Sequence, residues 1–478
     1  MCLQEAAGNF DKMSEKKLKK NLRFYFALWF AKGTALVLKL IGRKGTSMPG
    51  SWAIILCPDF IGRMDKPEKI IAITGTNGKT TISNMVDDIL ERRGEDFVCN
   101  REGSNVPTGI ASALIANSNF FGKPKKKLAV FEVDERSSLR IYPYMQPDIL
   151  AVTNIFRDSY KRNAHTEYIT NILNNCIPDK TKLILNGDDP VCSSLKKNND
   201  RAYFGIDKLS FEPGTTKNIV RDGAVCPECH TPLTYDFTRY HHVGKAHCEN
   251  CGYHTPEADY RVTSVDKEKG RIYANIKGED IDIKMLDDSP INIYNQITAA
   301  AILYEYGLSL EEIKNAFEEQ KIDTTRFEKT VHEGKTYIRH LCKGQNPVAS
   351  SRCMENAKNI PGKKIVYTFL DDHFDETSSV ENPAWFYDVD FEFLNDDSIG
   401  QIIVGGARHW DVYLRLLMAG IPAEKIVHSR EKMPAVEKSD VKNHDTFVIF
   451  YDVYTIGLSN QIQNKIMDMC SQLEKEEK

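Results

Sequence analysis

Residues 69–81 read KIIAITGTNGKTT, and this stretch decides the fold of the first part of the chain. Residues 69–75 form a short apolar run rich in β-branched side chains that ends at a glycine, which is typical of a buried parallel strand. Residues 80–91 (TTISNMVDDILE) then carry a helical pattern. A strand, a glycine-containing loop and a helix in this order predict a phosphate-binding loop.

The side chains of this loop have the chemistry that nucleotide binding needs. Glycines let the backbone approach phosphate oxygens, and the start of a helix supplies free N–H groups with a partial positive charge. Lys79 can reach the β- and γ-phosphates, and the Thr80 hydroxyl can ligate Mg²⁺. Two residues separate the two glycines, against four in the usual loop, so this is a specific variant. The expected nucleotide-binding residues are Gly75, Thr76, Asn77, Gly78, Lys79, Thr80 and Thr81.

Apolar, β-rich runs recur after this loop, with helix-like segments between them. They lie at residues 128–133, 149–153 and 182–185. Strands that alternate with helices predict a doubly wound α/β sheet. A helix is expected over residues 295–306.

The C-terminal part of the chain repeats this pattern on a smaller scale. Strand-like runs occupy residues 365–370, 401–404 and 447–450, with helical segments between them. We therefore expect a second, smaller α/β domain.

The length of 478 residues is enough for about three domains. We expect an N-terminal helical segment over residues 1–45, a nucleotide-binding domain over 46–325 and the smaller α/β domain over 326–478. The chain has 63 Lys and Arg against 67 Asp and Glu, for a net charge of −4. This balance argues against a protein that coats nucleic acid, because such proteins need a basic excess.

Residues 22–41 (LRFYFALWFAKGTALVLKLI) form an apolar and aromatic segment interrupted by Arg23, Lys32 and Lys39. A central lysine disfavours a membrane-spanning helix, and no small-residue cleavage site of a signal peptide follows. The first interpretation is a helix that packs on its own domain. The alternative is an interfacial helix that makes peripheral contact with a membrane.

Twelve cysteines are present, of which eight are scattered and four are clustered. Cys226 and Cys229 form one CxxC knuckle, Cys248 and Cys251 form another, and eighteen residues separate them. Two such knuckles offer four thiolates to one tetrahedral Zn²⁺, and a closed four-cysteine site is structural. The scatter of the other cysteines indicates a reducing compartment, so we expect a cytoplasmic protein.

We expect the zinc ribbon to be an insert over about residues 220–256. Gly252 suits the tight turn that directs N–H groups at sulfur. The histidines nearby are expected at the surface rather than as ligands, because four thiolates complete the site. They are His230, His241, His242, His247 and His254.

GTNGKTT resembles the ATP loop of the Mur ligase superfamily, the ATP-dependent amide ligases of peptidoglycan and folate metabolism. The resemblance implies ATP and Mg²⁺, with Glu132 of the FEVDE segment as a magnesium ligand beside Thr80. It also implies that Asn292 and Asn295 contact the adenine region, and that Arg326 is the arginine of a GR(M/F)E-like turn. In such ligases the γ-phosphoryl group moves to a carboxylate, and a nitrogen nucleophile then displaces phosphate.

Each of these residues also has a simpler interpretation. Glu132 could be a solvated charge at a strand end. Asn292 and Asn295 could cap the helix that follows. Asp188 and Asp189, in the NGDDP segment that resembles a Mur ligase turn, could be ordinary turn residues.

A zinc ribbon within a Mur ligase core, followed by a second α/β domain, resembles the MurT family. The resemblance includes Gly45 to Gly50 (GTSMPG), the pair Asn346 and Pro347, and Trp385 to Glu392 (WFYDVDFE). It implies a heterodimer with a GatD-like glutaminase that supplies ammonia. It also implies ATP-dependent amidation of the α-carboxylate of D-glutamate in lipid II, giving D-isoglutamine. The alternative is a Mur-type ligase that acts on another acceptor without a glutaminase.

One family position differs in this chain. An aspartate that the family places shortly before the WFYD segment completes the glutaminase's Cys–His catalytic group, and this chain has Asn382 there. An amide can orient a histidine but cannot stabilise imidazolium as a carboxylate does. Asp375 and Asp372 lie nearby in the sequence and are the candidate replacements, with Asp375 taken as the first of the two.

Overall fold

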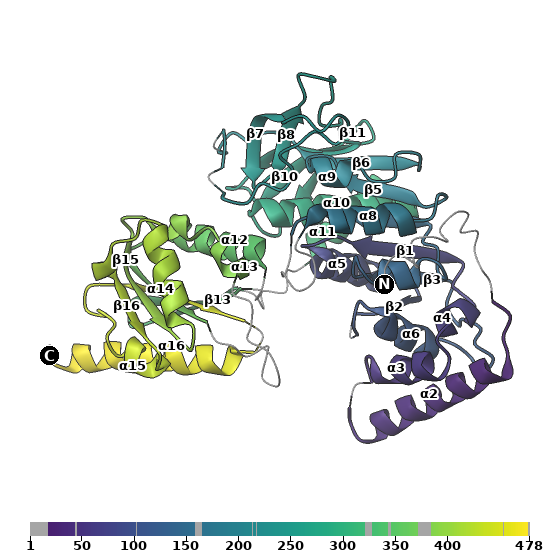
Figure 1. Cartoon of the computed structure of the whole chain (residues 1–478), viewed down its shortest axis with the longest axis horizontal. Helices are drawn as coiled ribbons and strands as arrows, with labels where there is room; N and C mark the ends of the chain where they lie inside the picture. Colours follow the sequence, from purple (N-terminus) through teal and green to yellow (C-terminus); the bar gives the residue numbers. More distant parts are fainter. Residues whose placement is uncertain are drawn as a thin grey trace. The chain divides into compact units, whose positions relative to one another are not determined.

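The structure is a computed structural model that describes residues 18–43, 45–101, 103–157, 165–212, 214–216, 218–320, 327–342, 346–370, 384–452 and 454–476. The chain divides into two compact units (Figure 1). The first consists of Met1–Phe156, His165–Thr216 and Arg221–Ile322, and the second of Arg157–Ala164, Lys217–Val220 and Asp323–Lys478.

The first unit is built on a nine-stranded sheet in the order β11-β10-β9-β6-β5-β4-β1-β3-β2. Strands β1 to β6 and β9 pair in parallel, and β9, β10 and β11 form an antiparallel meander at one edge. The strands are β1 (Lys69–Thr74), β2 (Phe97–Cys99), β3 (Leu128–Glu132), β4 (Ile149–Val152), β5 (Lys182–Asn186), β6 (Arg201–Ile206), β9 (Tyr260–Asp266), β10 (Arg271–Ile276) and β11 (Glu279–Lys284).

Strand β1 lies between β3 and β4, and the strand order reverses there. In open α/β sheets, ligands bind outside the carboxyl ends of the strands at such a switch point. The topology therefore places the loop after β1 where a ligand is expected.

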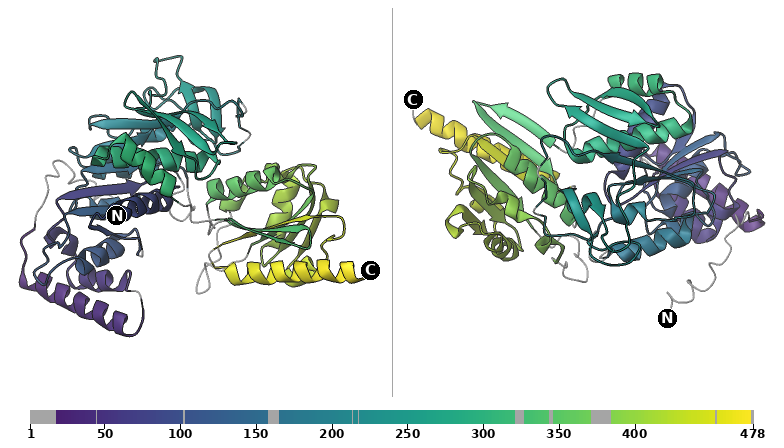
Figure 2. Two further views of the ribbon diagram at one scale, coloured as in Figure 1. Left: turned by 180° about the vertical axis from the view of Figure 1, so that it is seen from behind. Right: turned by 90° about the horizontal axis from the view of Figure 1, so that it is seen from above.

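Helices cover both faces of this sheet, as the doubly wound prediction requires (Figure 2). Helices α5, α10 and α11 lie on one face, and the others lie on the opposite face around a large apolar core. The helices are α2 (Leu22–Leu40), α3 (Met48–Leu56), α4 (Phe60–Arg63), α5 (Lys79–Arg92), α6 (Pro107–Ala116), α7 (Ser138–Ile141), α8 (Thr166–Cys176), α9 (Pro190–Ser193), α10 (Pro290–Tyr306) and α11 (Leu310–Glu319). Among the described residues, no helix has the length and apolar character needed to cross a membrane.

The second unit has a six-stranded sheet in the order β12-β13-β17-β14-β15-β16, with one apolar core on each face. All neighbours pair in parallel except the β12–β13 hairpin, so the predicted second α/β domain is confirmed. Its strands are β12 (Phe327–His332), β13 (Lys335–Leu341), β14 (Lys364–Phe369), β15 (Ile399–Gly405), β16 (Ile426–Ser429) and β17 (Thr446–Tyr451). Its helices are α12 (Pro347–Asn359), α13 (Ala384–Tyr387), η2 (Phe391–Leu394), α14 (His409–Met418), η3 (Ala423–Lys425), α15 (Lys432–Val436) and α16 (Ile456–Glu476).

The predicted insert contains a two-stranded antiparallel sheet, β7 (Thr234–Tyr240) and β8 (Val243–His247). Buried charges join this hairpin to the main sheet. Lys245 Nζ lies 2.5 Å from Asp188 Oδ1, and Arg239 Nη1 lies 3.5 Å from Asp188 Oδ2. Asp188 also accepts hydrogen bonds from the Tyr294 hydroxyl at 2.6 Å and from the backbone N–H of Ile206 at 2.8 Å. This carboxylate therefore joins the hairpin, strand β6 and helix α10.

We predict that Asp188→Asn destabilises the first unit by about 3–5 kcal/mol, because it removes the counter-charge of the half-buried Lys245 and one of the two carboxylates that pair with the buried Arg239. The matched control is Glu228→Gln, which removes an exposed ion pair with Lys197 and is expected to cost at most about 1 kcal/mol. Denaturant unfolding followed by circular dichroism measures both changes. Equal effects of the two variants would contradict this account of Asp188.

Candidate active site and metal centre

The loop between β1 and α5 has the backbone that its two glycines allow. Gly75 has φ of 120° and Gly78 has φ of 90°, both in the left-handed region that favours glycine. A Cβ at Gly75 would collide with Thr153 Oγ1, and a Cβ at Gly78 would collide with Asn295 Oδ1. Both positions therefore require glycine for conformation and for space.

The end of strand β4 holds this loop in place. The Thr153 hydroxyl donates to the carbonyl of Asn77 at 2.7 Å, and the backbone N–H of Asn77 donates to Asn154 Oδ1 at 3.0 Å. The backbone N–H of Thr76 donates to the Asn154 carbonyl at 2.9 Å. Protein contacts alone therefore fix the backbone of the loop from this side.

Lys79 is buried at the start of α5, with 8% of its surface exposed. Its ammonium donates to the Gly75 carbonyl and lies 3.3 Å from Glu135 Oε1. Burial alone would lower the pKa of Lys79, but the carboxylates around it, Glu135 first, outweigh burial and raise the pKa above its usual value. Lys79 is therefore a permanent positive charge inside the loop.

The first turn of α5 is open to an anion. Its N-cap is Gly78, which has no side chain to satisfy the first N–H groups of the helix. Thr80 is exposed at this end, so its hydroxyl is accessible. These groups fit the phosphates of a nucleotide and an accompanying magnesium ion.

Glu132 is the last residue of β3 and is half-buried. Side chains of two neighbouring asparagines fix its position from one side. Asn105 Nδ2 donates to Glu132 Oε1 at 2.8 Å, and the Asn100 side chain bonds the backbone N–H and carbonyl of Glu132. The carboxylate is thus a held oxygen donor, which suits Mg²⁺ and differs from a freely solvated charge.

Asn292 and Asn295 lie inside α10, whose N-cap is Ser289, so neither residue caps the helix. Asn295 is buried, its Oδ1 lies against Gly78, and its Nδ2 donates to Asn292 Oδ1 at 3.1 Å. The structure therefore brings Asn295 directly to the phosphate loop.

The zinc-ribbon hairpin supports the same loop through Phe156. The backbone N–H of Phe156 donates to the Thr76 hydroxyl at 3.0 Å. The ring of Phe156 packs on His242 with centroids 4.4 Å apart, and on Tyr240 at 6.0 Å.

The prediction that His241 and His242 lie at the surface was wrong, because both are buried at the hairpin tip.

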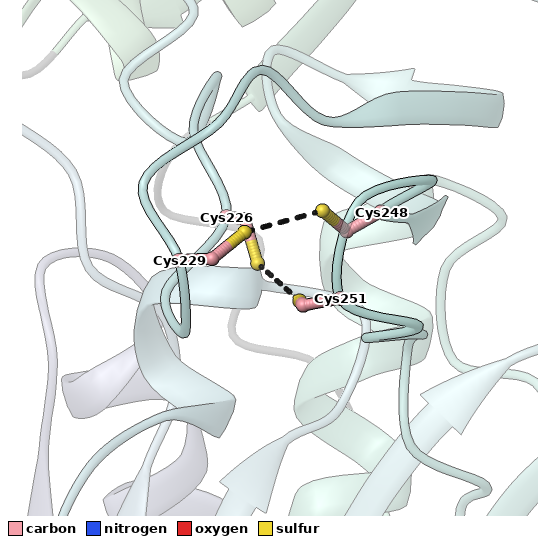
Figure 3. A group of neighbouring side chains, drawn as sticks. All are labelled: Cys226, Cys229, Cys248 and Cys251. Carbon is pink, nitrogen blue, oxygen red and sulfur yellow. Dashed lines mark hydrogen bonds between the residues drawn. The ribbon is translucent and has the colours of Figure 1, made fainter.

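The two CxxC knuckles converge, with the four Sγ atoms within 4.8 Å of one another (Figure 3). Cys226 Sγ lies 3.5 Å from Cys251 Sγ, and Cys229 Sγ lies 3.5 Å from Cys248 Sγ. The residue after each knuckle has a left-handed backbone, with φ of 60° at His230 and 75° at Gly252. This repeated turn and the donor set fit one tetrahedral zinc ion.

Three expected site residues, Arg326, Asp375 and Asn382, lie outside the described residues. Two site features escaped the sequence analysis. One is the contact of Lys79 with Glu135, and the other is the buried Arg239, whose guanidinium donates to Tyr294 and Glu212. The available signal for Arg239 was a charge at a position of β7 where the alternation of polar and apolar residues predicts an apolar side chain.

We predict that the purified chain holds about one zinc ion, and that Cys226→Ser combined with Cys251→Ser removes it. Loss of zinc should also lower the melting temperature, because the knuckles close the base of the hairpin. Elemental mass spectrometry and thermal unfolding measure the two effects. Cys99→Ser, outside the cluster, is the control and should keep its zinc. Zinc retention by the double variant would refute the assignment.

Two family models match this chain. The Mur ligase middle domain matches residues 73–225, which include the phosphate loop and end just before the first knuckle. The MurT ligase C-terminal model matches residues 343–456 of the second unit.

Full-length relatives are similar over nearly the whole chain. The lipid II isoglutaminyl synthase (glutamine-hydrolyzing) subunit MurT of Staphylococcus aureus (strain COL) is 31% identical over 442 residues, which cover 92% of this chain and 95% of the relative. The subunit of the same name from Streptococcus pneumoniae is 31% identical over 458 residues, which cover 94% and 100%.

Solved structures share the fold at lower identity. A pseudomurein peptide ligase type C from Methanothermus fervidus has a TM-score of 0.64 at 21% identity, covering 86% of this chain and 81% of the other. MurF from Thermotoga maritima, solved with ADP, has a TM-score of 0.55 at 13% identity, covering 90% and 85%. Mur ligase membership implies ATP and Mg²⁺. By its fold, its phosphate loop and its full-length similarity, the chain belongs to the MurT family of ATP-dependent ligases.

Proposed function

We propose that this chain amidates the α-carboxylate of D-glutamate in the lipid II stem peptide to D-isoglutamine, in the cytoplasm. The observation that carries the proposal is the phosphate loop in which Lys79, Thr80 and Glu132 surround the carboxyl end of β1. The coverage of the two MurT relatives supports lipid II as the acceptor, since their names give that substrate.

The proposed reaction has two steps. A carboxylate oxygen of the acceptor attacks the γ-phosphorus of ATP, the bond to the bridging oxygen breaks, and ADP leaves. The nitrogen of ammonia then attacks the carbonyl carbon of the acyl phosphate, inorganic phosphate leaves with its bonding electron pair, and the nitrogen loses a proton. The product is a primary amide.

In the first step, the residues of this chain stabilise the negative charge on the transferring phosphoryl group. The Lys79 ammonium and the N–H groups at the start of α5 neutralise the transferring phosphoryl group, which is the main catalytic task in phosphoryl transfer. Mg²⁺ held by Thr80 and Glu132 would supply further charge neutralisation at the phosphates. Asn295 and Asn292, with Arg326, are proposed to hold the nucleotide beside the loop.

We further propose that a GatD-like glutaminase supplies the ammonia in a heterodimer with this chain. The second unit matches the MurT ligase C-terminal model. A Mur ligase that only adds an amino acid would not account for a domain of this kind. Position 382, where this chain has Asn, would contribute to the partner's Cys–His catalytic group, with Asp375 as the alternative contributor.

The decisive experiment is co-expression with a GatD-like glutaminase, followed by incubation with ATP, glutamine and lipid II. Mass spectrometry of the stem peptide should show a loss of about one mass unit, because OH is exchanged for NH₂. Amidation with ammonium but never with glutamine would favour the ligase without a glutaminase. ATP turnover with unchanged lipid II would show that the acceptor is another carboxylate.

We predict that Lys79→Ala lowers the rate of amidation by about 10²–10³-fold, the typical loss when one preorganised charge-stabilising group is removed. The control is Lys197→Ala, which removes an exposed lysine from an ion pair far from the loop sequence and should leave the rate within twofold. Product formation under saturating ATP is the measurement. A rate for Lys79→Ala close to that of the control would refute the proposed role.

A further prediction separates the two candidate contributors to the glutaminase. If Asp375 replaces the family aspartate, Asp375→Asn should lower glutamine-dependent amidation by about 10²-fold or more, since the carboxylate stabilises imidazolium. Ammonium-dependent amidation should be unchanged, because it bypasses the glutaminase. If Asn382 is the contributor, Asn382→Ala should show this split and Asp375→Asn should not.

A further inference from the structure

Helix α2 is apolar on the side that faces solvent as well as on the side that faces its domain. Its buried side chains are Phe24, Ala27, Leu28, Ala31 and Leu38. A second set of large apolar side chains on α2 and at its C-terminal end is 44–88% exposed, and consists of Leu22, Phe26, Trp29, Phe30, Leu36, Val37, Leu40 and Ile41. Their spacing of three or four residues places this second set on one stripe, opposite the buried one.

Two neighbouring segments extend this stripe into a broader surface. The ring of Phe30 contacts Trp52 of α3 with centroids 5.6 Å apart, and the indole N–H of Trp29 donates to the Phe120 carbonyl at 2.9 Å. The exposed apolar residues of these segments are Met48, Trp52, Ile55, Phe120 and Phe121. We call the exposed set on residues 22–55 and 120–121 the apolar face. It lies along the outside of the first unit, where α2 and α3 run (Figure 1).

This concentration is unusual for a surface that faces only water. Of the twenty-six large apolar side chains that are exposed among the described residues, thirteen belong to the apolar face. Soluble monomers rarely gather exposed apolar groups into one large patch, and such patches mark protein or membrane interaction sites.

The charges around the apolar face indicate whether it binds a protein or a membrane. Helices α2 and α3 contain no Asp or Glu. At about 100° per residue, Arg23 and Lys39 fall on opposite flanks of the exposed stripe of α2, between it and the buried one. Both side chains are exposed, as are Lys19, Lys123 and Lys125 nearby. A basic rim around an aromatic face complements an anionic lipid surface, where lysines extend to headgroups and tryptophans lie at the interface.

We propose that the apolar face docks on an anionic lipid bilayer, with α2 lying in the plane of the headgroup boundary. Both interpretations of α2 from its sequence would then apply, because one face packs on the domain and the other contacts lipid. The proposal does not depend on the proposed reaction, because bare vesicles without any peptidoglycan precursor test it.

The test is co-sedimentation of the full chain with vesicles of phosphatidylcholine containing about 30% phosphatidylglycerol. The variant Phe26→Ser/Leu36→Ser/Leu40→Ser should lower the partition coefficient by about tenfold or more, since it removes exposed apolar groups without touching the buried face. The matched control, Trp410→Ser/Leu414→Ser/Met418→Ser, alters an exposed apolar face of α14 and should bind within about twofold of the unaltered chain. Vesicles of phosphatidylcholine alone should bind several-fold less.

A second measurement detects lipid contact directly and does not depend on a variant that has lost binding. In a Trp410→Phe background, brominated lipids should quench the fluorescence of Trp29 and Trp52, which the apolar face would place at the interface. The proposal is overturned if the unaltered chain stays in the supernatant and is not quenched. It is also overturned if the two triple variants bind equally, or if the apolar face instead drives self-association that the α2 variant abolishes without any binding to vesicles.

Discussion

The close approach of three backbone segments around Gly75 and Gly78 is the constraint on which the active site depends. Thr153 and Asn154 at the end of β4 contact the loop from one side, and Asn295 of α10 contacts Gly78. Any side chain at either glycine would force these segments apart. The parallel pairing of β1 with β4 sets the first approach, and the packing of α10 on α5 sets the second. The phosphate loop is therefore a property of the whole sheet rather than of its local sequence.

The ribbon insert takes part in this arrangement although its metal site is structural. Its hairpin tip packs on Phe156, whose backbone bonds Thr76, and its charged side chains reach the buried Asp188. Asp189, the next residue, caps α9 and accepts the backbone N–H of Ile155 at 2.8 Å. The NGDDP segment is thus more than a turn, because its two carboxylates join the insert to the strands that carry the loop.

Much of the fold could be predicted because its central strands are apolar runs between helical patterns, and the central sheet, its helices and the second domain were confirmed. Two of the missed strands, β12 and β11, lack that signal. All six residues of β12 are exposed, and it forms by pairing with β13 across a turn at Glu333 and Gly334 with positive φ. In β11 charged residues alternate with Ile281 and Ile283 at a sheet edge. The phosphate loop and the cysteine knuckles were visible as local motifs. The contacts of Asp188 with Arg239 and of Lys79 with Glu135 join residues 51 and 56 positions apart, which no local pattern specifies.

The pairing of Lys79 with Glu135 also follows from the burial of the loop. An ammonium group buried without a counter-charge is costly, so a buried lysine in a phosphate-binding loop needs an anion beside it. Glu135, 3% exposed and on the segment that follows β3, supplies that anion. Nucleotide phosphates would then exchange one anion for another around Lys79 rather than bring a charge into an unpaired site. Glu132, three residues earlier, is oriented by Asn105 instead of by the lysine, so it stays available to a cation. The two glutamates of one short segment therefore have different tasks because different neighbours hold them.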